Sequence, residues 1–299
     1  MKLYAPKYYK EFTCIADKCK HSCCIGWEID VDEEALEKYA TLENGYGKKI
    51  IKSIDFEETP HFKLLKNDRC PHLDSTGLCK IIKNFGEGYL CHICREHPRF
   101  YNQIGDRMEV GLGISCEEAC RIILNTDEYD VITEIGEICQ EAEAVDFDSA
   151  LHRKEIYRIL SRKDVDYKSK LEIIYEKFGV YPSVCTDEEW RGLIDSLEYL
   201  DASHKKLFLN YSFELRENEK NEKYSERVLA YFIYRHCSKA WDETEFREWL
   251  GFCLFCERLF ASAVMVSKES VFEIARIISE EIEYSEDNTN EITAMYFEK

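Results

Sequence analysis

Ten of the fifteen cysteines in this chain lie between residues 14 and 120, and they stand in four clusters. The clusters follow the patterns C-x4-C-x3-CC, C-x8-C, C-x2-C and C-x3-C, which contain Cys14, Cys19, Cys23, Cys24, Cys70, Cys79, Cys91, Cys94, Cys116 and Cys120. Thiolates from several short segments suit a metal ion or cluster that needs three or four soft ligands from different directions. The spacing therefore predicts a metal centre.

Two kinds of metal centre remain open. One tetrahedral zinc ion takes four ligands, whereas this region offers ten thiols and the histidines His21, His72, His92 and His97. It has room for two zinc ions or for one iron–sulfur cluster with spare thiols, and we favour the 4Fe-4S cluster. The C-x3-C-x2-C pattern of radical S-adenosylmethionine enzymes is absent, because Cys24 follows Cys23 directly. A standard radical enzyme is therefore disfavoured.

The other five cysteines are expected to be core residues. Cys253 and Cys256 have the spacing of a ligand pair, but they lie in an apolar helical run without a second pair nearby. Cys139, Cys185 and Cys237 are single cysteines at apolar positions, where a thiol behaves as a small buried hydrophobe. We expect no metal ligand among them.

Composition narrows the class of partner and the compartment. The chain has 59 acidic and 40 basic residues, a formal charge of -19, which repels nucleic acid and anionic membranes and attracts basic protein segments. An odd number of clustered cysteines argues against a disulfide framework and for a reducing compartment. No stretch was expected to reach the roughly 18 apolar residues of a spanning helix. A soluble, cytoplasmic protein without a nucleic-acid or membrane partner is predicted.

The elements that position the first clusters are short. Acidic residues after Asp32 predict a helix that ends near Leu42. Alternating residues on both sides of Gly105 and Asp106 predict a hairpin over residues 100–110. Residues 1–125 thus form a cysteine-rich region of loops, short helices and one small sheet.

Residues 126–299 are expected to be helical, because apolar residues recur at helical spacing. Predicted helices cover residues 131–138, 154–160, 171–178, 190–200, 202–216, 225–239, 244–265 and 268–284. The acidic tail 281–290 is expected to fray. The predicted fold class is therefore mainly α, with the cysteine-rich region 1–125 packed on a multi-helix region 126–299. No G-x-G-x-x-G follows a strand, which disfavours a Rossmann methyltransferase.

The order of the cysteine patterns resembles a known family. C-x4-C-x3-CC-x2-W, then C-x8-C, then C-R-x-x-P-R and an S-C-x-E turn are similar to the flagellin lysine-N-methylase family (FliB-like). This resemblance extends over most of the chain, including the aromatic helix around residues 228–236. Residues 14–99 alone also resemble the wider YkgJ-like group of cysteine-cluster proteins.

The first resemblance implies methyl transfer from S-adenosylmethionine to lysine side chains of flagellin, with an iron–sulfur or other metal centre. The thiols that match the family motif are Cys14, Cys19, Cys23, Cys24, Cys70, Cys79, Cys94 and Cys116. Cys91 and Cys120 are additions in this sequence. Where the family has proline after the last motif cysteine, this chain has Glu117. The YkgJ-like resemblance alone implies a metal-binding or electron-transfer module that is not an enzyme.

Four polar residues are candidates for the chemistry. A lysine amine with a pKa near about 10.4 must lose a proton before it attacks a methyl group. Candidate proton acceptors are Glu109, Glu118 and Tyr101, and Arg99 is a candidate for binding the cofactor carboxylate. Solvated side chains and structural ion pairs remain the competing interpretation for each.

Overall fold

The computed structural model describes residues 1–43, 45–142, 146–213 and 221–297. The chain forms two compact units. One, which we call the thiol unit, is Thr13–Arg99, and the other, the helical unit, joins Met1–Phe12 to Phe100–Lys299. Residues 100–125, which the sequence grouped with the cysteine clusters, lie in the helical unit.

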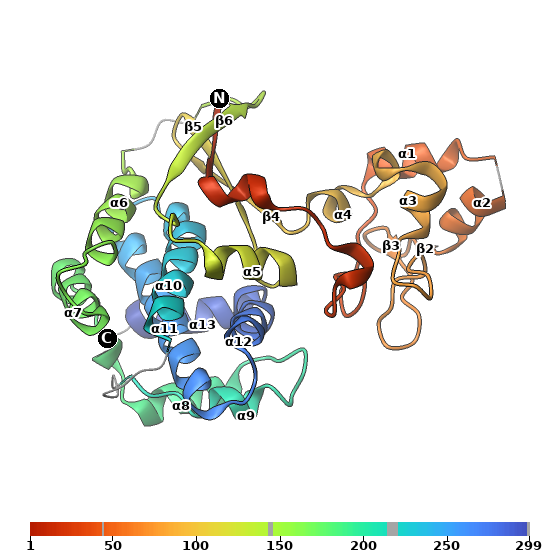
Figure 1. The fold of residues 1–299 in the computed structure, drawn as a ribbon. Coiled ribbons are helices and arrows are strands. Elements are labelled where there is room, and N and C mark those ends of the chain that lie inside the picture. The colour runs from red at the N-terminus through yellow and green to blue at the C-terminus, as the bar shows by residue number, and fades with distance from the viewer. Residues whose placement is uncertain (44, 143–145, 214–220, 298–299) are drawn as a thin grey trace. The chain divides into compact units, whose positions relative to one another are not determined.

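Short elements make up the thiol unit (Figure 1). Its helices and strands are α1 (Glu33–Ala40), α2 (Gly45–Lys52), β2 (Ile54–Asp55), β3 (His61–Phe62), α3 (Lys80–Phe85) and α4 (His92–Glu96), with 3-10 turns at Ala16–Lys18 and Glu87–Tyr89. The carboxylate of Asp32 caps α1 by accepting a hydrogen bond from the Ala35 amide at 3.0 Å, as expected for an acidic N-cap. The predicted helix is confirmed, and it ends two residues before Leu42.

The thiol unit has its own hydrophobic core. Its buried apolar side chains include Ile29, Val31, Ala35, Tyr39, Ile50, Ile54, Phe62, Leu73 and Ile81. The thiols of Cys70 and Cys91 are buried among them. A small unit with few buried apolar side chains gains little free energy from burial, so a metal centre would add stability that the core lacks.

A four-stranded sheet opens the helical unit. It consists of β4 (Arg99–Ile104), β5 (Arg107–Leu112), β1 (Lys2–Pro6) and β6 (Ile132–Glu137), in that spatial order. β1 runs parallel to β5 and antiparallel to β6. The predicted hairpin is confirmed as β4 and β5, with Gly105 in the turn at φ +59°.

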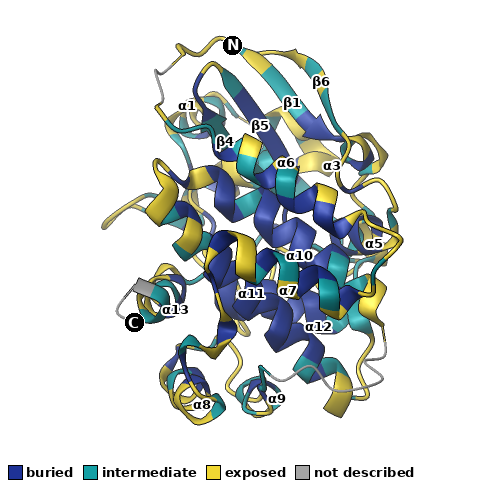
Figure 2. Ribbon diagram, turned by 90° about the vertical axis from the view of Figure 1, so that its left-hand side faces the viewer, coloured by how far each residue is buried: buried dark blue, intermediate teal, exposed yellow. Residues whose placement is uncertain are grey.

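The rest of the helical unit is α-helical, so the mainly α fold class is confirmed. Its helices are α5 (Glu117–Asn125), α6 (Ser149–Leu160), α7 (Tyr167–Phe178), α8 (Asp187–Ser196), α9 (Lys205–Phe208), α10 (Glu222–His236), α11 (Glu243–Val266), α12 (Val271–Ile278) and α13 (Glu286–Phe297). α10 and α11 pack against each other and are buried along much of their length (Figure 2). The helix expected over 202–216 shortens to α9, and its residues 214–216 lie outside the described residues.

One helix departs from the expectation about apolar stretches. Within the described residues α11 is long and apolar enough to cross a membrane, with a mean hydropathy of 1.6 over its best window. However, 72% of that window is buried inside the fold. α11 is therefore buried in the way that a core helix of a folded domain is.

The predicted helix at 131–138 is wrong, because this segment forms β6. Ile132, Ile135 and Ile138 have helical spacing, but isoleucine is β-branched and favours strands. β6 pairs with β1, more than 120 residues away in sequence. Long-range pairing with β1 therefore overrides the local pattern.

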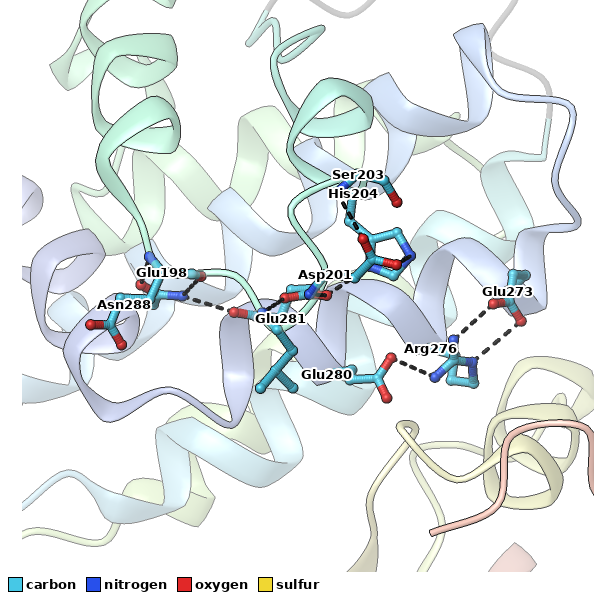
Figure 3. Close-up of polar contacts among 10 residues, drawn as sticks. Glu198, Asp201, Ser203, His204, Glu273, Arg276, Glu280, Glu281 and Asn288 are labelled. Carbon is cyan, nitrogen blue, oxygen red and sulfur yellow. Dashed lines mark hydrogen bonds and ion pairs between the residues drawn. The ribbon is translucent and has the colours of Figure 1, made fainter. Parts of the chain in front are cut away.

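The acidic tail is also ordered rather than frayed. A π-helical turn at Ser279–Glu283 joins α12 to α13, and Glu281 and Glu283 are buried. Figure 3 shows Glu281 beside the loop that carries His204, where its carboxylate accepts hydrogen bonds from the amides of Leu200 and Asp201 at 2.7 and 3.1 Å. Backbone amides about 80 residues earlier in the sequence thus hold this acidic segment in place.

Candidate metal centre

Five thiols meet in the thiol unit. Each interacts electrostatically with at least two of the others, and they are Cys24, Cys70, Cys79, Cys91 and Cys94. All five belong to the hydrophobic core of this unit or pack against it. Four of them are among the predicted ligands, and the fifth, Cys91, is the thiol that the family resemblance left as an addition.

Backbone contacts bring these separate segments together. The Cys70 amide donates a hydrogen bond to the Cys24 carbonyl at 2.9 Å, which joins the first cysteine cluster to the second. An isolated bridge pairs Leu73 with Cys79 and closes the second cluster into a tight loop. Cys91 is the N-cap of α4, so the C-x2-C spacing places Cys94 within the first turn.

The thiols influence each other's protonation. A hydrogen bond from Cys23 lowers the pKa of Cys24 to about 7. Burial raises the pKa of Cys70 to about 12. A hydrogen bond between Cys91 and Cys94 lowers the pKa of Cys91 and raises that of Cys94, so the two thiols titrate as a coupled pair.

The grouped thiols are the kind of ligand that a soft metal centre needs, although the described residues do not form a preassembled site for one ion. Among them, no group of three or more His, Cys, Asp or Glu side chains stands ready to hold one metal ion. Four sulfurs around one zinc ion would lie about 3.8 Å apart, given a Zn–S bond of about 2.3 Å. An iron–sulfur cluster spaces its cysteine ligands more widely, because several irons and sulfides lie between them. The five thiols come from three of the cysteine clusters, and the choice between an iron–sulfur cluster and zinc stays a prediction.

Polar side chains beside the thiols have defined partners. The hydroxyl of Tyr39 lies 3.4 Å from the Cys91 sulfur and also donates to the Tyr89 carbonyl at 2.8 Å. Both ring nitrogens of His72 are within 2.9 Å of hydroxyl groups, those of Tyr46 and Ser53. Burial lowers the pKa of His72 to about 4, so the ring is neutral. His72 is thus engaged in packing and hydrogen bonding rather than presented as a ligand.

Three predicted ligands of the thiol unit are more accessible. Cys14 and Cys23 are exposed, and Cys19 is partly exposed. The Cys19 sulfur donates to the His21 carbonyl at 3.2 Å. These thiols come from the loop around the 3-10 turn Ala16–Lys18, and Cys23 is joined to the buried group through Cys24.

The last cysteine cluster lies in the helical unit. Cys116 is the N-cap of α5 and packs beside the core of this unit. Cys120 is buried one turn later, where its sulfur donates to the Phe272 carbonyl at 3.4 Å. The predicted ligand set is therefore divided, with seven members in the thiol unit and Cys116 in the helical unit. Its role as a ligand stays a prediction.

The candidate catalytic residues have different surroundings. Glu109 is 2% exposed on β5 and forms a buried ion pair with Arg153 at 2.7 Å. Glu118 pairs with Arg121 at 2.7 Å, and this hydrogen bond lowers the pKa of Glu118. Tyr101 is 47% exposed on β4, which makes it the most accessible of the three. Their roles as proton acceptors stay predictions.

Arg99, the candidate for cofactor binding, begins β4 and is partly exposed. Its guanidinium lies 3.4 Å from the Arg95 carbonyl, one turn earlier in the chain. Its role in binding the cofactor carboxylate stays a prediction.

Sequence reasoning missed Cys91 and the buried ion pair of Glu109 with Arg153. The C-x2-C spacing of Cys91 and Cys94 was a usable signal, since it is typical of paired ligands. No comparable signal marks Arg153, because it lies 44 residues from its partner.

Comparison with known proteins bears on this arrangement. No family model and no solved structure matches the chain. Lysine-N-methylases of Salmonella typhimurium and Salmonella choleraesuis are each 26% identical over 143 residues, 43% of this chain and 34% of theirs. The flagellar biosynthetic protein FliU of Salmonella muenchen is 27% identical over 127 residues, 40% of this chain and 75% of FliU. The alignment thus spans about a third of the methylases. The resemblance found in the cysteine patterns is confirmed over about two fifths of the chain rather than most of it: the chain is similar to proteins named for lysine methylation and flagellar biosynthesis.

Proposed function

We propose that this protein transfers a methyl group from S-adenosylmethionine to lysine ε-amines of flagellin, in the cytoplasm. The observation that carries the proposal is the similarity to the Salmonella lysine-N-methylases. The similarity to FliU supports flagellin as the substrate. The formal charge of -19 favours an encounter with lysine-bearing segments.

The reaction needs a neutral amine aligned with the methyl group. The lysine nitrogen attacks the methyl carbon, and the carbon–sulfur bond breaks while its electron pair returns to sulfur. S-adenosylhomocysteine leaves, and the amine gives up one proton to a base. Tyr101 has the access to substrate that this base requires, whereas Glu109 is occupied by Arg153.

The metal centre, when bound, would cross-link the segments of the thiol unit through thiolate bonds. The thiol unit has short elements and a small core, so its loops depend on such cross-links more than the helical unit does. The fold of the protein brings the thiols together. The backbone hydrogen bond between Cys70 and Cys24 joins two segments, and helix α4 carries Cys91 and Cys94 at its start.

The experiment incubates anaerobically purified protein with flagellin from the same organism and S-adenosylmethionine. Intact-mass measurement should show steps of one methyl group, and peptide mapping should place them on lysines. Cys79→Ser and Cys94→Ser should abolish methylation, because each removes a thiol from the buried group. Cys139, which the sequence places in the core, is instead exposed and lies outside that group, so Cys139→Ser is the control for the loss of an unrelated thiol. Metal-replete protein that adds no methyl group would refute the proposed activity.

A second candidate function is a metal-binding or electron-transfer module that is not an enzyme. The observation that favours it is that Thr13–Arg99 forms a compact unit with its own core and its own group of thiols. Calorimetric titration with S-adenosylmethionine separates the candidates. A methylase must bind this cofactor, whereas a module without that activity gives no binding heat.

A further inference from the structure

The family motif assigns no role to Cys91, yet the structure places this residue inside the group of buried thiols. We propose that Cys91 is a ligand of the metal centre, together with other thiols of the same unit. This inference rests on the metal centre of the proposed function. It concerns which thiols hold the metal and does not depend on the methyl-transfer reaction.

The first argument is the position of the Cys91 sulfur. Cys91 is 1% exposed, is hydrogen-bonded to Cys94 and interacts electrostatically with Cys79. A cysteine kept only for packing would be surrounded by apolar side chains, as a small hydrophobe is. Cys91 instead has two other thiols as neighbours, and both of them are predicted ligands.

The second argument is the way in which Cys91 is held. The carboxylate of Asp32 accepts a hydrogen bond from the His92 amide at 2.6 Å, which fixes the start of α4 directly after Cys91. Tyr39 places its hydroxyl 3.4 Å from the sulfur. This hydroxyl donates its one proton to the Tyr89 carbonyl, so it accepts from the Cys91 thiol, and its proton would have to turn from Tyr89 to the sulfur to bind a thiolate. Hydrogen bonds of this kind orient metal ligands and tune their electron density.

The third argument concerns the number of ligands. A 4Fe-4S cluster takes four cysteines. The group of five thiols lies in one compact unit and contains one thiol more than a cluster needs. Cys91 and Cys94 form a C-x2-C pair of the kind that ligates clusters, which favours Cys91 as one of the four.

The test compares Cys91→Ser with Cys120→Ser in the full chain, purified anaerobically and reconstituted with iron and sulfide. Both residues are 1% exposed, and both lie outside the family motif. Iron, sulfide and zinc per chain and the visible absorption of iron thiolates are measured. Cys91→Ser should lower the metal affinity by more than about tenfold. A tenfold loss is the smallest effect expected from removing a residue that only hydrogen-bonds to a metal ligand. Cys120→Ser should keep the wild-type metal content.

Thiol labelling of the wild-type protein covers the case in which Cys91→Ser does not fold. Cys91 should be protected from alkylation in metal-loaded protein and should react after chelation, as read by peptide mass. Cys120 gives the rate that burial alone allows, and it should not change on chelation. A Cys91→Ser protein with wild-type metal content and spectrum, or labelling of Cys91 that ignores chelation, would overturn the assignment. Wild-type protein that binds no metal would instead refute the metal centre itself.

Discussion

Replacing Glu281 by glutamine should destabilise the helical unit strongly, although Glu281 lies in a sequence that reads as a solvated acidic tail. The side chain of Glu281 is 1% exposed. Its carboxylate accepts hydrogen bonds from the amides of Leu200 and Asp201 and from Nδ1 of His204, at 2.7, 3.1 and 2.7 Å (Figure 3). The neutral amide keeps the shape but supplies one acceptor oxygen and no charge.

The expected loss follows from these contacts. A hydrogen bond to a charged group contributes about 1.5–3 kcal/mol, and the substitution removes or weakens three of them. Breaking one side of a buried charge pair costs about 3–5 kcal/mol. We therefore expect Glu281→Gln to lower the free energy of unfolding by about 3 kcal/mol.

The same carboxylate makes stability depend on pH. Its hydrogen bond raises the pKa of His204 above the ordinary value of 6.5. A raised pKa in the folded state means that the contribution to stability is complete below pH 6.5 and is lost as the pH rises through the folded pKa. Glu281→Gln should remove this dependence above pH 6.5.

The assay is urea unfolding followed by far-ultraviolet circular dichroism, which reports mainly on the helical unit. Glu280→Gln is the matched control, because Glu280 pairs with Arg276 and is 22% exposed. Arg276 keeps its second partner, Glu273, so this change should cost less than about 1 kcal/mol. Equal losses for the two variants, or a loss below about 1 kcal/mol for Glu281→Gln, would refute the reasoning.

Two further predictions concern the core of the helical unit. Glu109→Gln should lower the free energy of unfolding by about 3 kcal/mol, because it leaves Arg153, 4% exposed, without its buried carboxylate; unchanged urea unfolding would contradict this. Gly251→Ala should cost about 1–3 kcal/mol, since the new Cβ would lie 2.6 Å from the ring of Tyr296. Gly192→Ala meets no atom within 4 Å and should instead stabilise by about 0.5–1 kcal/mol, and thermal unfolding of both variants checks the difference in sign.

Local signals account for what the sequence predicted well. The N-cap Asp32 and the turn at Gly105 act within a few residues, so α1 and the β4–β5 hairpin are predictable from their own segments. Cysteine spacing likewise indicated that thiols from several segments converge. It did not distinguish Cys91, which packs among the other thiols, from Cys120, which packs in the helical unit.

Contacts between distant residues account for most of the errors. The segment at Ile132 becomes a strand because β1 is available to pair with it, and local spacing carries no information about β1. Glu281 can be buried because backbone amides donate hydrogen bonds to its carboxylate. These amides lie about 80 residues earlier in the chain, where the local sequence gives no sign of them. An acidic run is therefore a poor guide to exposure where amides and an imidazole elsewhere supply its hydrogen bonds.

The helical unit consists of two segments that are separated in sequence by the thiol unit. This arrangement determines which unit is translated completely first. β1 pairs in parallel with β5 between Lys2 and Arg107, so its partner strand is made about 100 residues later. At about 5–20 residues per second, β1 waits roughly 5–20 s on the ribosome without that partner. Thr13–Arg99 is complete before β5 has been translated. The proposed metal centre would therefore be able to form on the nascent thiol unit before the helical unit has folded.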